Sequence, residues 1–191
     1  MTTDRSVEAH RRMADQAYEL KKKYSQTFGM SKKKFIELDE MGEVQLSTVY
    51  ENLFVAARNH IGWPTAKVSV DQYDFMTIDQ NGRRRPLGDM KTVTVQKQTS
   101  TKNCAYLVKN TKNKLGAIYV VGYDRHHDKF HYFAIPDWVK KPKFYLPIPI
   151  DFVTGEPTEA SKYSVFQCAS FEDMILSKYI NIAKVWKVWK K

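Results

Sequence analysis

The stretch YDFMTIDQNGRRRPLGDMKTVTVQ, residues 73–96, decides the fold of this chain. Residues from 66 onward are rich in β-branched and aromatic side chains, which are typical of strands. Asn81-Gly82 then separates two such runs, and this dipeptide is a strong signal for a hairpin turn. We therefore predict a strand over residues 66–79 and a second strand over residues 86–95, folded back beside the first.

The predicted hairpin carries charged residues that the turn brings together. Asp89 and Lys91 are two positions apart and so project from one face of a strand, and the turn places Asp74 alongside them. Buried charges of this kind must pair with one another or hold a cation. Two carboxylates and one ammonium are the groups that a Mg²⁺-dependent phosphodiesterase needs to hold the metal and orient or deprotonate a water. The alternative interpretation is a salt bridge on a solvated face.

Outward from the hairpin, the spacing of apolar residues changes between helical and strand-like. Residues 117–124 (AIYVVGYD) are almost continuously apolar, which is typical of a strand buried on both faces. Residues 129–135 alternate and should pair with that strand through a turn at residues 125–128. The proline-rich residues 136–157 must be extended, irregular or at a sheet edge. Helices are predicted over residues 7–24, 31–38, 47–61 (with Ser47 as N-cap and Gly62 as stop), 99–113 and 171–190.

This order of elements predicts an α/β or α+β fold: a central mixed sheet of about four to five strands, flanked by helices. We divide the chain into an N-terminal helical region (residues 1–45), a core (residues 46–136) and a C-terminal extension (residues 137–191).

The charge distribution points to a polyanionic partner. The chain of 191 residues has a formal net charge of +10. Residues 83–114 hold nine basic residues and one acid, Asp89, so this segment accounts for +8 of that charge. Nucleic acid is the simplest partner for such a surface.

Composition excludes several other classes of protein. No run of about 18 apolar residues predicts a transmembrane helix, and the polar first residues show no secretory signal. The two cysteines, Cys104 and Cys168, are too few for a disulfide framework and are expected to be reduced thiols. We expect a cytoplasmic protein that does not bind membranes.

Two segments resemble a known superfamily. ENLFVAARNHIGW (residues 51–63), followed by residues 73–96, is similar to the PD-(D/E)xK nucleases, and above all to their homing-endonuclease and Holliday-junction-resolvase-like members. The resemblance covers residues 47–136 and implies a restriction-endonuclease-like core. The name motif is altered at two positions, because Tyr73 replaces the proline and position 89 holds Asp in place of Glu.

The resemblance also assigns roles to single residues. Asp74 and Asp89 would be metal ligands, Lys91 the catalytic lysine, and Glu51 the helix carboxylate that completes or supports the metal site. Asp71, three residues before Asp74, is the rival candidate for the first aspartate. The implied cofactor is Mg²⁺, with Mn²⁺ as a substitute.

Together these features predict a site-specific DNA endonuclease of homing or restriction type, and the resemblance implies 5′-phosphate and 3′-hydroxyl products. One active site cuts one strand, so cleavage of double-stranded DNA would need a homodimer or a higher homo-oligomer. A Holliday-junction resolvase or repair nuclease of the same fold is an alternative. A non-catalytic nucleic-acid-binding module is an alternative of another class, and divalent-metal dependence separates it from the nucleases.

Several basic side chains are predicted to contact DNA. Arginines beside the hairpin turn suit bidentate contacts to phosphate or guanine, and lysines that follow the second strand suit phosphate. The predicted DNA-binding residues are Arg83, Arg84, Arg85, Lys97 and Lys102. The N-terminal helical region and KVWKVWKK (residues 184–191) are further candidates for DNA contact, although the latter pattern favours packing on the core.

Histidines at positions 126, 127 and 131 invite comparison with HNH nucleases, in which a histidine activates water. The ladder of Asn and His that such a unit needs is missing from the sequence. A surface turn (RHHDK, residues 125–129) followed by a strand histidine is therefore the preferred interpretation.

Overall fold

The computed structural model describes residues 3–24, 33, 46–97, 104–139 and 144–176. They form a mixed α+β fold around an eight-stranded sheet in the order β1-β2-β3-β5-β6-β8, with β4 paired to β3 and β7 paired to β4. Among the described strands, β3 and β5 are parallel and every other pair is antiparallel. The prediction of a mixed sheet with helices is confirmed, but the predicted four to five strands are too few. The strands are β1 (Thr65–Val70), β2 (Tyr73–Ile78), β3 (Arg84–Lys97), β4 (Cys104–Lys109), β5 (Ala117–Asp124), β6 (Lys129–Ile135), β7 (Tyr145–Ile150) and β8 (Gln167–Cys168).

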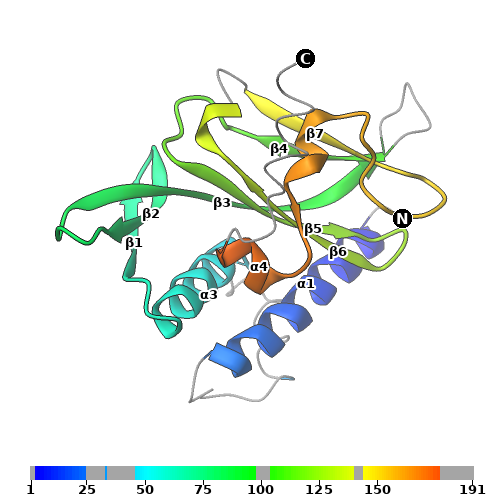
Figure 1. The fold of residues 1–191 in the computed structure, drawn as a ribbon. Coiled ribbons are helices and arrows are strands. Elements are labelled where there is room, and N and C mark those ends of the chain that lie inside the picture. The colour runs from blue at the N-terminus through cyan, green and yellow to red at the C-terminus, as the bar shows by residue number, and fades with distance from the viewer. Residues whose placement is uncertain (1–2, 25–32, 34–45, 98–103, 140–143, 177–191) are drawn as a thin grey trace.

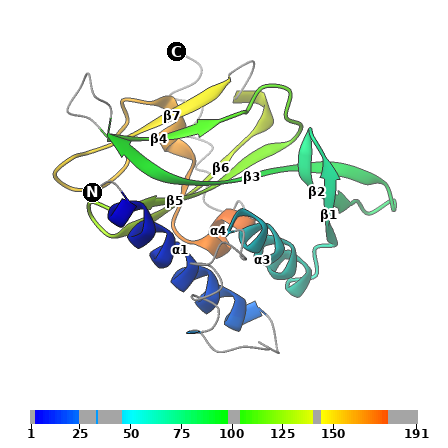
Figure 2. The same ribbon diagram turned by 180° about the vertical axis from the view of Figure 1, so that it is seen from behind.

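Three α-helices cover one face of the sheet, and β4 and β7 lie over the other, as Figures 1 and 2 show from opposite sides. The helices are α1 (Thr3–Tyr24), α3 (Leu46–His60) and α4 (Phe171–Leu176), and the 3-10 helices are η1 (Asp137–Val139) and η2 (Lys162–Phe166). Each face therefore has its own apolar cluster. We call the cluster under the helices the helix-side core and the cluster under β4 and β7 the outer core.

Strand β5 joins the two cores. Tyr119 and Val121 belong to the helix-side core, while Ile118 and Val120 belong to the outer core. Successive side chains on a strand point to opposite faces, so a strand between two cores must be apolar throughout. The prediction that this strand is buried on both faces is confirmed, as are its bounds and those of β6.

The predicted strand over residues 66–79 is in fact a hairpin of its own. It divides into β1 and β2, which pair antiparallel on either side of a turn at Asp71 and Gln72. The next turn is wider than Asn81-Gly82 alone, because Asp79 closes it: its carboxylate accepts hydrogen bonds from the backbone N–H groups of Asn81 and Arg83. The chain thus makes a three-stranded meander before it reaches β4.

The predicted helix over residues 99–113 is wrong in its described part. Residues 104–109 form strand β4, which pairs with the end of β3 and along its whole length with β7. Tyr106 and Val108 do point into a core, but at strand spacing. Tyr106 lies against Gly122 of β5, where an added Cβ would come within 2.8 Å of the Tyr106 ring. Pairing with the end of β3 and with the distant strand β7 therefore overrides the helical propensity of the segment.

The predicted helices are present, but their starts differ from the prediction. α1 ends at Tyr24 as predicted and begins at Thr3, and α3 begins at Leu46, so Ser47 lies inside the helix and its prediction as N-cap is wrong. The helix ends before Gly62, whose φ of 84° and bond to the Asn59 carbonyl close it. Residues 31–38 lie largely outside the described residues, and of the predicted C-terminal helix only α4 lies within them.

The proline-rich segment is an edge strand, as one of its predicted alternatives required. β7 (YLPIPI) pairs only with β4 among the described strands, and its two prolines alternate with buried Leu146, Ile148 and Ile150. A proline lacks the N–H that a second neighbour would need, which suits an edge. The region after residue 136 thus supplies β7 and β8 to the sheet.

Candidate active site

The candidate site lies where β2, β3 and β5 meet. β2 and β3 pair antiparallel, but the register shifts between Phe75–Gly88 and Met76–Pro86, which leaves Leu87 as an extra residue on β3. Gly88 then passes so close to β5 that an added Cβ would be 2.1 Å from the Ala117 carbonyl oxygen. This close approach sets the position of Asp89, the next residue.

Asp89 is the centre of the site. Its side chain is 1% exposed, and it projects with Lys91 from the outer-core face, because Val93 and Val95 on the same strand face pack there. Lys91 Nζ lies 2.8 Å from Asp89 Oδ2. The predicted proximity of Asp89 and Lys91 is therefore present, but on a buried carboxylate and not on a solvated face.

Asp74 joins the same group from β2. Its Oδ2 accepts a hydrogen bond of 2.8 Å from the backbone N–H of Met90, which fixes its carboxylate beside Asp89. Burial, and then the negative charges of Asp89 and Glu51, raise the pKa of Asp74 to about 6, against the lowering effect of the Met90 hydrogen bond. A carboxyl whose pKa is raised by burial and by other carboxylates is characteristic of functional sites.

Glu51 stands near this group without joining it. It lies in α3 on the helix side of the sheet, and its Oε2 is 2.7 Å from Lys67 Nζ on β1. Its negative charge contributes, after burial and Asp89, to the raised pKa of Asp74. Its predicted role as a supporting carboxylate stays a prediction. The rival Asp71 lies in the exposed turn between β1 and β2.

Sequence reasoning missed Lys114, the second lysine of the site. Lys114 Nζ lies 3.0 Å from Asp89 Oδ1 and also donates a hydrogen bond to the Asp71 carbonyl. The residue precedes β5, and it reaches Asp89 because β5 runs parallel to β3 with Ala117 opposite Gly88. In the sequence, Lys114 is marked only as a basic residue in a turn directly before a buried strand. The parallel register of β3 and β5 is needed to place it beside Asp89.

The donor set suits a hard divalent cation in part. Among the described residues, no group of three His, Cys, Asp or Glu side chains is arranged to hold a metal ion. Asp89 Oδ2 is nevertheless buried and accepts no hydrogen bond from the described residues, because the neighbouring Lys91 ammonium is an ion-pair contact without hydrogen-bond geometry. Mg²⁺ is commonly bound through one or two carboxylates, with waters and substrate phosphates as the remaining ligands. Asp74 and Asp89 fit that pattern.

The predicted DNA-contacting arginines lie at the turn end of the hairpin of β2 and β3, several residues along each strand from Asp74 and Asp89. Figure 1 shows this hairpin extending away from the helices. Arg83, Arg84 and Arg85 are all exposed, but Arg85 Nε donates to Asp79 Oδ2 at 2.8 Å and is held at the turn. Arg84 and Arg85 are adjacent in β3 and so point to opposite faces. Of the predicted lysines, Lys97 ends β3 and Lys102 lies outside the described residues.

The three histidines lie in the turn and in the strand predicted for them. His127 sits in the predicted turn and contacts the buried Asp124 carboxylate at 2.6 Å, while His131 is buried on β6 against the Tyr106 hydroxyl. Burial lowers the pKa of His131. This agrees with the interpretation as a turn followed by a strand histidine.

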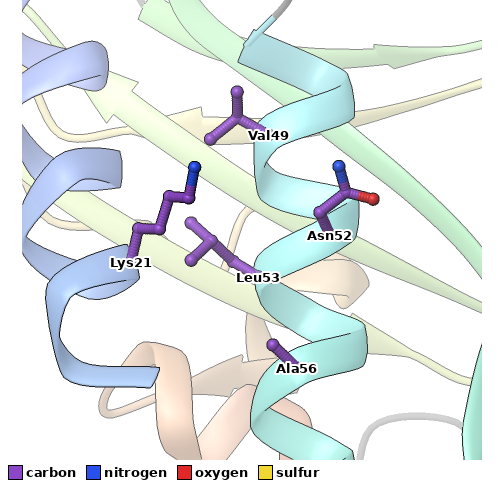
Figure 3. A pocket seen from close by; sticks show the side chains of 5 residues that line it. All are labelled: Lys21, Val49, Asn52, Leu53 and Ala56. Carbon is purple, nitrogen blue, oxygen red and sulfur yellow. The ribbon is translucent and has the colours of Figure 1, made fainter. Parts of the chain in front are cut away.

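A small groove lies between α1 and α3, away from the carboxylates. Figure 3 shows its lining, which is apolar except for Lys21 and Asn52 and includes none of the predicted site residues. The candidate site thus lies on the sheet and not in this groove.

Comparisons with known proteins add little to this geometry. No protein-family profile matches the chain, and no curated protein sequence matches it. A solved structure of a bacterial homing endonuclease is distantly similar, at 16% identity and a TM-score of 0.29, over 53% of this chain and 74% of that one. A TM-score this low does not establish a shared fold. Separately, none of the described helices is long and apolar enough to cross a membrane.

Proposed function

We propose that this protein is a Mg²⁺-dependent DNA endonuclease that hydrolyses phosphodiester bonds. The observation that carries the proposal is the junction of β2, β3 and β5, where Asp74, buried Asp89 and Lys91 converge. Mg²⁺ bound there would acidify a water and stabilise negative charge on the reacting phosphate.

The residues of this chain have separate tasks in that reaction. Asp74 and Asp89 would hold the cation through their oxygens, and the Met90 N–H fixes the orientation of Asp74. Lys91, whose side chain is 23% exposed, is the more open of the two lysines on Asp89. Its ammonium can therefore orient the attacking water and stabilise the developing phosphate charge. Glu51 supports the site from α3 through its negative charge.

Double-stranded DNA is the proposed substrate, held as a polyanion by the basic hairpin and the lysines beyond it. The proposed products carry 5′-phosphate and 3′-hydroxyl ends, and Mn²⁺ is expected to replace Mg²⁺. We propose a homodimer or higher homo-oligomer, located in the cytoplasm, that cuts specific sites as homing and restriction enzymes do. A junction-resolving or repair nuclease would use the same groups.

The test is cleavage of supercoiled plasmid, linear phage DNA and four-way junctions, with Mg²⁺, Mn²⁺ or EDTA. Wild type should nick or cut in either metal and not in EDTA, whereas Asp89→Asn and Lys91→Ala should bind DNA without cutting it. Lys112→Gln is the matched control, because this exposed lysine lies close to the site in sequence. The preferred substrate then separates the three nuclease roles.

One observation favours the second candidate function, a non-catalytic nucleic-acid-binding module. Asp89 already forms ion pairs with two lysines, and a carboxylate held in such ion pairs can be structural. DNA binding without cleavage of any of these substrates in any divalent metal would establish that function in place of the nuclease.

A further inference from the structure

Lys114 holds the carboxylate that the proposed function assigns to the metal. Its Nζ is 3.0 Å from Asp89 Oδ1, and its side chain is 18% exposed. Lys91 contacts the other oxygen of the same carboxylate. Both oxygens of Asp89 therefore face an ammonium group.

The backbone of the loop that carries Lys114 is fixed by contacts with neighbouring turns and strands, which keeps this lysine beside Asp89. Asn113 and Gly116, on either side of it, have φ angles of 64° and 77°, and a Cβ on Gly116 would be 2.4 Å from the Leu87 carbonyl oxygen. The backbone N–H of Leu115 donates to the Gln72 carbonyl at 2.8 Å. The loop is thus fixed to the turn between β1 and β2 and to the bulge of β3.

Lys114 differs from Lys91 in having a second acceptor. Its ammonium also donates to the Asp71 carbonyl, which belongs to the exposed turn. The Lys114 ammonium can therefore leave Asp89 and keep its hydrogen bond to the Asp71 carbonyl. Its other N–H groups can then donate to solvent or to an anion near that turn. Lys91 has only the Asp89 contact among the described residues.

We propose that Lys114 is the resident counter-ion of Asp89, which competes with the divalent cation and is drawn off by a phosphate of the DNA backbone. The proposal rests on the proposed function, since it concerns the same metal site. A cation that approaches Asp89 is repelled by the ammonium and must displace it. Because an anionic phosphate offers that ammonium a new partner, DNA and metal should strengthen each other's binding, as linkage requires. Lys114 is thus a positioning residue that makes metal loading depend on substrate.

The experiment measures Mn²⁺ binding by the loss of the electron paramagnetic resonance signal of free Mn²⁺. Wild type, Lys114→Gln, Lys114→Arg and the control Lys112→Gln are titrated alone and with a short DNA duplex, whose own Mn²⁺ binding is subtracted. Gel electrophoresis after each titration verifies that the duplex is intact. Circular dichroism verifies that each variant is folded.

Without DNA, Lys114→Gln should bind Mn²⁺ about tenfold more tightly than wild type, because one charge-assisted contact no longer has to be broken. The duplex should tighten Mn²⁺ binding by wild type and by Lys112→Gln more than by Lys114→Gln. Damage to the structure would weaken metal binding, so a gain in affinity cannot come from it.

Equal or weaker Mn²⁺ binding by folded Lys114→Gln overturns the inference, and the proposed function survives if wild type still cleaves plasmid. Absence of Mn²⁺ binding in all four proteins overturns both. If Lys114→Gln does not fold, Lys114→Arg decides. Its guanidinium can bind the carboxylate more firmly and should weaken Mn²⁺ binding, so unchanged or tighter binding would refute the competition.

Discussion

Replacing Asp74 by Asn should stabilise the metal-free protein while abolishing cleavage. The pKa of Asp74 is raised from 3.8 to about 6, first by burial and then by the charges of Asp89 and Glu51. The folded protein therefore holds the Asp74 proton more tightly than the unfolded chain does. The stability that this proton provides is fully present below pH 3.8, is lost as the pH rises through about 6, and is absent at pH 8.

The size of the effect follows from that shift. A pKa change of about two units corresponds to roughly 3 kcal/mol, and partial access of the side chain to water reduces this to about 1–2 kcal/mol. Asn keeps an oxygen that can accept the Met90 N–H and removes the charge, so Asp74→Asn should gain that energy at pH 8. For a chain of this length the gain is a rise in Tm of about 3–6 °C.

The assay is thermal unfolding between pH 4 and pH 8 in EDTA. At pH 8 Asp74→Asn should melt above wild type, and the difference should shrink as the pH falls toward 4. Asp79→Asn is the comparison of opposite sign. Asp79 accepts hydrogen bonds from Arg85 and from backbone N–H groups, which lower its pKa, so the ionised carboxylate stabilises the turn. Removing that charge in Asp79→Asn should therefore lower Tm at pH 8. A lower Tm for Asp74→Asn at pH 8 would refute the assignment of Asp74 as a destabilising, functional carboxylate.

Three further outcomes are expected. Cleavage should fall as the pH drops below about 6, because protonated Asp74 is a poor ligand, and more Mg²⁺ should move the midpoint of the pH–rate profile lower. Gly88→Ala should push β3 away from β5. It should lower the free energy of unfolding measured in urea by more than about 2 kcal/mol and abolish cleavage. The double variant Arg83→Ala, Arg84→Ala should release about two fewer counterions on binding DNA, measured as a shallower slope of log affinity against log salt concentration. Arg125→Ala should leave that slope unchanged.

What the sequence could predict depended on how far apart the interacting residues are. β5, β6 and α3 follow from local periodicity, and the pairing of β2 with β3 follows from one turn. β4 could not be predicted, because residues 104–109 become a strand through β3 and through β7, which lies far along the chain. The same non-local pairing accounts for most of the strands by which the sheet exceeds the predicted number.

The residues of the candidate site show the same difference between local and long-range interactions. Asp74, Asp89 and Lys91 lie in one hairpin, so alternation and a turn were enough to bring them together. Lys114 and Lys67 reach the carboxylates through the register of β5 and the packing of α3 on β1. No local pattern contains that information, because a basic residue before a strand is normally solvated.

The three lysines that pair with the carboxylates determine the charge that a metal ion would meet at the site. Lys67 pairs with Glu51, while Lys91 and Lys114 pair with Asp89, so the ammonium groups offset the carboxylates before any cation arrives. A divalent cation entering this group adds two positive charges to a balanced site, which is unfavourable where burial lowers the effective dielectric. The backbone of DNA supplies the compensating negative charge. A nuclease built in this way should hold its metal firmly only when a phosphate is present, and metal affinity without DNA should be correspondingly weak.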